Sequence, residues 1–145
     1  MRMMDVHSLI SEFEAGTLPK SAWTHEAHLT MALWHITQAP DVWTAICLIK
    51  DRIISFNRRV GTCNTGDSGY HETITIFWAL ELAGFREQNQ GLAFDALIEK
   101  LLRDERFRNT AHIKSFYDAA TLKSPRARAT YVAPTTTTGR DNVPA

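Results

Sequence analysis

The amino-acid sequence predicts an all-α fold: a compact single-domain bundle of about five to six helices with a buried central helix near residues 70–84. Apolar residues recur at helical spacing along most of the chain, and glycines, prolines and cap-forming residues separate these periodic segments. Residues 73–76 have a β-branched composition that would also suit a strand, but no other segment is suited to pair with them. A chain of 145 residues also buries enough surface to form a core without disulfides or structural zinc.

The N-terminal part of the chain is predicted to form three helices. Apolar residues at i, i+3, i+4 and i+7 predict the first over residues 5–14, with Asp5 as its N-cap. A second helix is expected to follow Thr24, whose side chain can cap it, and to end before Pro40. A third helix follows that proline and closes near residues 57–61, where a glycine is available to end it.

A loop and a buried helix are predicted next. Residues 61–69 contain three glycines with an asparagine, an aspartate and a serine, which is typical of a shaped loop. In residues 70–83 apolar side chains surround the helix axis on nearly every side. This pattern predicts the central helix of the bundle.

The last third of the chain is predicted to hold two more helices and a tail. The periodicity favours a fifth helix over residues 94–102 and a sixth over residues 113–120, with the charged residues 103–108 as the bend between them. The Ser-Pro pair at 124–125 can start one further short turn. We expect residues 1–133 to form the single domain and the polar residues 134–145 a mobile tail.

Composition excludes several classes of partner. Lysine and arginine number 16, as do aspartate and glutamate, so the zero formal charge argues against nucleic acid and against an anionic membrane surface. No apolar stretch approaches the roughly 20 residues of a spanning helix, and the N-terminus lacks the apolar core of a signal peptide. The two cysteines do not form a closely spaced pair. We therefore expect a cytoplasmic protein whose partner is a small-molecule substrate or ligand; the sequence gives no indication of oligomeric state.

Two histidine clusters are the main indication of function. They lie in residues 23–29 (Trp-Thr-His-Glu-Ala-His-Leu) and 69–75 (Gly-Tyr-His-Glu-Thr-Ile-Thr), at the starts of two predicted helices. His25 and His28 are one helical turn apart on an inward face, and His71 is also expected to point at a neighbouring helix. Three imidazoles can hold a divalent transition metal such as zinc, iron, nickel or copper with one coordination position left open.

A metal-dependent reaction on a small molecule follows from this interpretation. Glu72 would act as a base or support a metal ligand, and Tyr70 could donate a hydrogen bond to a substrate oxygen. The predicted reaction class is hydrolysis, elimination or isomerisation. Neither cluster completes the His-Glu-x-x-His pattern of zinc proteases, and no Glu-x-x-His pair indicates a di-iron site.

Other interpretations of the same residues remain open. Histidines near helix starts are often hydrogen-bonded core or capping groups. The residues could instead line a metal-free polar pocket, in which His71 and Glu72 act as acid and base. The alternative to an enzyme is a non-catalytic helical module whose apolar pocket binds a small ligand or a partner chain.

The two clusters and a third motif resemble a known pattern. Together with residues 122–128 (Leu-x-Ser-Pro-x-Ala-Arg), they are similar to an uncharacterised family of small helical bacterial proteins, over residues 10–133. The resemblance implies that the two histidine clusters belong to one recurring pattern. It implies no substrate.

Overall fold

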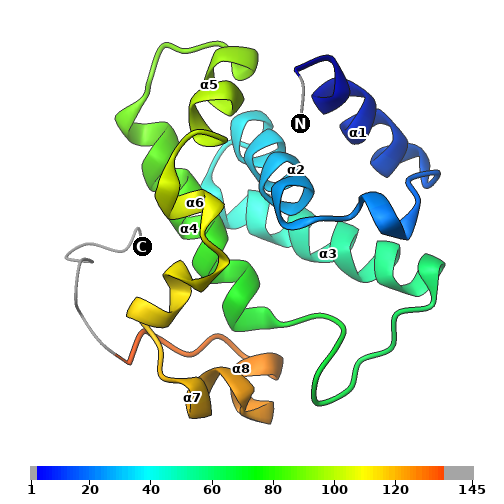
Figure 1. Cartoon of the computed structure of the whole chain (residues 1–145), viewed down its shortest axis with the longest axis vertical. Coiled ribbons are helices and arrows are strands. Elements are labelled where there is room, and N and C mark those ends of the chain that lie inside the picture. The colour runs from blue at the N-terminus through cyan, green and yellow to red at the C-terminus, as the bar shows by residue number, and fades with distance from the viewer. Residues whose placement is uncertain (1–2, 136–145) are drawn as a thin grey trace.

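The computed structural model describes residues 3–135, and every regular element in that range is helical, which confirms the all-α fold (Figure 1). The elements in chain order are α1 (Met3–Ala15), a short 3-10 helix (Lys20–Ala22), α2 (His25–Gln38), α3 (Val42–Val60), α4 (Glu72–Gln88), α5 (Phe94–Leu101), α6 (Glu105–Arg108), a second 3-10 helix (Thr110–Ser115), α7 (Ala119–Lys123) and α8 (Pro125–Ala129). Within residues 3–135, no helix combines the length and the apolar character needed to cross a membrane.

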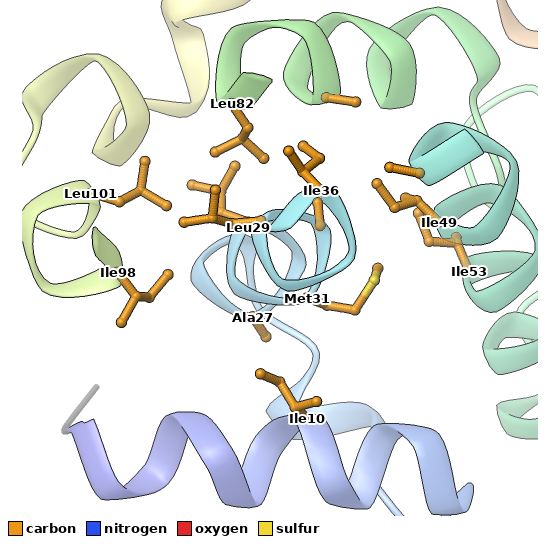
Figure 2. Packing of buried hydrophobic residues seen from close by; sticks show 14 of the residues in the cluster. Ile10, Ala27, Leu29, Met31, Ile36, Ile49, Ile53, Leu82, Ile98 and Leu101 are labelled. Carbon is orange, nitrogen blue, oxygen red and sulfur yellow. The ribbon is translucent and has the colours of Figure 1, made fainter. Parts of the chain in front are cut away.

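Helix α2 lies at the centre of the main core. Figure 2 shows it in the middle of the core, with α1, α3, α4 and α5 around it. Its labelled side chains point in different directions, with Ala27 towards Ile10 of α1 and Leu29 towards α4 and α5. This arrangement is possible because α2 carries apolar or small residues on most of its faces, and almost all of them are buried.

Helix α4 corresponds to the central helix predicted near residues 70–84, and it packs against α2, α3 and α8. Phe77 and Leu82 are fully buried. One side of the helix, which includes Ile74 and Trp78, is only half-buried and faces a cleft. The centre of the fold is therefore shared between α2 and α4.

The helix ends follow from local chemistry. The side chain of Thr24 accepts a hydrogen bond from the backbone N–H of Ala27 at 3.2 Å, which confirms it as the N-cap of α2. Gly61 ends α3 with a left-handed φ of 78°. The first helix begins at Met3, so Asp5 lies inside α1 and the prediction that it caps this helix is wrong.

The region after α5 differs from the prediction. The charged residues 103–108 contain α6, and the continuous helix expected over residues 113–120 is replaced by a 3-10 helix and α7. The cause is two helix caps that the prediction did not include. The side chains of Asn109 and Asp118 each accept a hydrogen bond from a backbone N–H, and each starts a new short helix. The apolar residues of this segment nevertheless pack on Phe77 of α4 in a second, smaller core.

An extended segment follows α8 and crosses α4. The Thr73 side chain donates a hydrogen bond to the carbonyl oxygen of Thr130 at 2.9 Å. The hydroxyl of Tyr117 donates one to the carbonyl oxygen of Val132 at 2.7 Å. The backbone N–H of Thr135 donates to the carbonyl oxygen of Phe116 at 2.8 Å. The tail was predicted over residues 134–145, of which 136–145 lie outside the described residues.

Candidate functional site

A cleft between α2, α3 and α4 holds most of the predicted site residues. Its inner part has a volume of about 300 Å³ and mainly apolar walls. The lining residues are His25, His28, Leu29 and Ala32 from α2, Ile49 and Ile53 from α3, and Ile74, Thr75, Trp78 and Ala79 from α4. The sequence alone did not indicate the contribution of α3, because the apolar face that lines the cleft has the same spacing as an ordinary core face.

The outer part of the cleft is larger and more polar. It has a volume of about 430 Å³ and extends to the loop over residues 61–69. Tyr70, His71 and Arg128 are among its lining residues. The two parts adjoin because they share the residues His28, Ile53, Ile74 and Thr75. The inner part of the cleft is therefore mainly apolar and the outer part is more polar, and His28 lines both.

His28 is held in one tautomer by its own helix. Its Nδ1 lies 2.7 Å from the carbonyl oxygen of Thr24, which can only accept a hydrogen bond. The ring also packs against Trp23, with 3.8 Å between ring centroids. Burial in the cleft lowers the pKa of His28 to about 4, against the opposing effect of the Thr24 hydrogen bond. The imidazole is therefore neutral at pH 7, with a lone pair on Nε2.

His25 lies at the same inner part of the cleft but is anchored from outside its helix. Its Nε2 is 2.7 Å from the carbonyl oxygen of Phe107, the buried aromatic residue of α6. The edge of the ring meets Trp78, with 5.1 Å between ring centroids. His25 therefore connects α2 to α6 while it lines the cleft.

His71 has both ring nitrogens occupied. It is the N-cap of α4, and its Nδ1 accepts a hydrogen bond from the backbone N–H of Ile74 at 3.1 Å. Its Nε2 must then carry the proton, which it donates to the carbonyl oxygen of Leu122 at 2.8 Å. Burial lowers the pKa of His71, and the charge of Arg128 adds to this effect. The residue is therefore a neutral connector between α4 and α7.

The structure does not support the predicted metal site of His25, His28 and His71. Within residues 3–135, no three side chains of His, Cys, Asp or Glu are grouped so that they could hold a metal ion. Helical periodicity correctly placed the three histidines along one cleft, but it could not show where their ring nitrogens point. Each ring is turned towards a backbone carbonyl group, and His71 has no lone pair left for a metal.

Tyr70 and Glu72, the two predicted catalytic residues, contact each other. The Tyr70 hydroxyl donates to Oε1 of Glu72 at 2.7 Å, and Lys50 Nζ lies 3.2 Å from the same oxygen and 3.4 Å from Oε2. Burial and the hydrogen bond to Glu72 raise the pKa of Tyr70, so that its hydroxyl stays protonated at neutral pH. Tyr70 lines the outer part of the cleft, whereas Glu72 lines neither part. Glu72 therefore orients Tyr70 and pairs with Lys50.

Arg128 is the main functional candidate that the residue-by-residue reasoning missed. Its guanidinium group donates to the backbone carbonyl oxygens of Gly66, Ser68 and Tyr70 at 3.2, 3.0 and 3.3 Å. These bonds attach the loop over residues 61–69 to α8 at the edge of the cleft. Only its place in the 122–128 motif pointed to this residue, since a lone arginine in a helix is usually exposed to solvent.

No protein family, curated protein or solved structure was found to match this chain. The resemblance of its three motifs to a family of small bacterial proteins therefore stays a prediction, and the arrangement of the cleft is the basis for any statement about function.

Proposed function

We propose that this protein binds a small, mainly apolar molecule in the cleft between α2, α3 and α4. The observation that carries this proposal is the composition of the cleft: an inner part with mainly apolar walls adjoins a more polar outer part, and His28 belongs to both. Ligand sites in proteins are typically preformed apolar pockets with a few polar groups that fix orientation. The cleft has this composition.

The energetics also favour an apolar ligand. Transfer of apolar surface out of water contributes about 25 cal/mol for each Å² buried. The inner walls are leucine, isoleucine, alanine and tryptophan side chains from three different helices, which are held in place by the core behind them. An apolar molecule in this space would gain contacts without requiring the helices to move.

Binding is preferred to catalysis because the groups expected to transfer protons are already engaged. Glu72 interacts with Tyr70 and Lys50, and both ring nitrogens of His71 are hydrogen-bonded to the backbone. A general base needs a lone pair within reach of the proton that it removes. Glu72 lines neither part of the cleft and His71 has no free lone pair, so neither residue meets this requirement in the structure.

Prodan, an uncharged naphthalene dye whose emission shifts to the blue in apolar surroundings, tests the proposal. We expect saturable binding to the wild-type protein. Ala32→Phe fills the inner part of the cleft and should weaken binding at least tenfold. Ser55→Phe adds the same side chain at an exposed position of α3 and should not change it.

Circular dichroism establishes whether each variant is folded. If Ala32→Phe does not fold, Ala79→Leu replaces it, because Ala79 of α4 lines the same space. Absence of saturable binding to the wild-type protein would overturn the proposal. Equal affinity of the wild-type protein and a folded, filled variant would also overturn it, since the dye would then bind elsewhere.

A further inference from the structure

We propose that the cleft selects uncharged aromatic molecules that carry an O–H or N–H group, such as phenols and indoles, and that His28 Nε2 accepts the hydrogen bond from that group. This inference rests on the function proposed above and names the class of ligand. It follows from the direction of one hydrogen bond, the surroundings of the His28 ring and the shape of the inner part.

The tautomer of His28 decides which ligand group can bind. Because the carbonyl oxygen of Thr24 is only an acceptor, Nδ1 carries the proton and Nε2 of the neutral ring is left as an acceptor. Among residues 3–135, no group donates a hydrogen bond to this atom. Nε2 is also not fully buried, because the fully buried side-chain atoms without a partner in this range do not include it. His28 Nε2 is therefore an accessible acceptor on the wall of the cleft.

The absence of charge on His28 argues against an anion at this point. Desolvation in the cleft keeps the ring neutral at pH 7, as its low pKa indicates. A carboxylate placed against Nε2 would bring two acceptors together and would lose its own hydration. An alcohol, phenol, amine or indole N–H would instead form a hydrogen bond in a site with few competing water molecules.

The outer part of the cleft offers a competing possibility. Lys20 and Arg128 lie there and could attract an anionic group, although Asp67 lines the same region and Arg128 is already hydrogen-bonded to three carbonyl groups. Binding of an anion by Lys20 and Arg128 is therefore the main alternative that the experiment must distinguish from our inference.

The dimensions and walls of the inner part favour one or two planar rings. A protein cavity of about 150 Å³ is sufficient for benzene, and the inner part has about 300 Å³. Trp78 and the isoleucine side chains of α3 and α4 form its walls, while Trp23 packs against the His28 ring. Aromatic rings stack or meet edge-on with such side chains.

Three naphthalene derivatives of nearly equal size test the inference by isothermal titration calorimetry at pH 7. They are 2-naphthol, which donates a hydrogen bond; 2-methoxynaphthalene, which does not; and 2-naphthoate, which is an anion. We expect 2-naphthol to bind about tenfold more tightly than 2-methoxynaphthalene, as one buried hydrogen bond implies. The anion should bind more weakly than 2-naphthol.

Variants then assign this preference to His28. In His28→Phe the ratio of the two dissociation constants should fall to about one, while 2-methoxynaphthalene still binds. His7→Phe, at an exposed position of α1 outside the cleft, should keep the wild-type ratio. The nitrogen chemical shift of His28 Nε2 in the wild-type protein provides a measurement that needs no variant, since 2-naphthol should move it and 2-methoxynaphthalene should not.

The outcomes separate the two proposals. If none of the three compounds binds, the proposed function is wrong. If 2-naphthol and 2-methoxynaphthalene bind equally, or if the preference survives in a folded His28→Phe variant, the cleft binds apolar molecules but the role of His28 is wrong. Tightest binding of 2-naphthoate would overturn the inference in favour of an anion held by Lys20 and Arg128.

Discussion

His28 Nδ1 lies 2.7 Å from the carbonyl oxygen of Thr24, the residue whose side chain caps the same helix. One residue thus performs two tasks: its side chain starts α2, and its carbonyl group sets the tautomer of a histidine in the cleft. Because the two groups belong to one turn of helix, the orientation of the His28 ring depends on local structure more than on long-range packing.

The cap can be separated from the carbonyl contact by substitution. Thr24→Ala removes the hydrogen bond to Ala27 but leaves the backbone carbonyl group in place. We expect a loss of about 1 kcal/mol in the free energy of unfolding, which corresponds to a decrease of about 2–4 °C in Tm. Thr24→Ser keeps the hydroxyl and should behave like the wild-type protein in thermal denaturation; equal loss in both variants would show that the cap is not the cause.

Stability should fall as the pH is lowered from about 7 towards 4. The pKa of His28 is about 4 in the folded protein and about 6.5 in an unfolded chain. Between these values the unfolded state binds more protons, so protonation favours unfolding and stability rises with pH. Urea denaturation at pH 5 and pH 7.5 measures the effect, which should be smaller in His28→Phe. If wild type and variant show the same pH dependence, the effect belongs to other groups. His71 is one such group, because burial also lowers its pKa.

Arg128 should control the mobility of the loop over residues 61–69. Arg128→Ala removes two hydrogen bonds to carbonyl groups of the loop and a third to that of Tyr70, which follows the loop. We expect faster hydrogen–deuterium exchange in the loop and a stability loss of roughly 1–3 kcal/mol. Arg126→Ala, an exposed neighbour on α8, is the matched control and should leave exchange in the loop unchanged. Unchanged exchange in Arg128→Ala would mean that the loop holds its shape without this residue.

Two glycines of the same loop form a matched pair. At Gly69 the backbone has a φ of +91°, and an added Cβ would lie 2.2 Å from Asn64 Oδ1 and 2.7 Å from Asn64 Cα. At Gly66 an added Cβ would meet nothing within 4 Å. We therefore expect Gly69→Ala to destabilise the protein by more than about 1 kcal/mol, whereas Gly66→Ala should remain within about 0.5 kcal/mol of wild type. Urea denaturation of both variants makes the comparison, and equal stability would contradict the constraint at Gly69.

The sequence by itself determined the fold class and most of the helices. Thr24 and Gly61 are residues whose local chemistry starts or ends a helix, so the boundaries of α2 and α3 could be predicted without knowledge of the rest of the chain. The prediction failed where two caps were overlooked: Asn109 starts a 3-10 helix before the expected sixth helix, and Asp118 starts α7 within it.

Tertiary structure alone decided what His25 and His71 do. Periodicity placed His25, His28 and His71 on inward faces, and the structure places all three along one cleft. Periodicity could not predict that the carbonyl group of Phe107, 82 residues from His25, and that of Leu122, 51 residues from His71, would each take up a ring nitrogen. Hydrogen bonds to a distant backbone depend on how helices pack, and side-chain spacing within one helix carries no information about that packing.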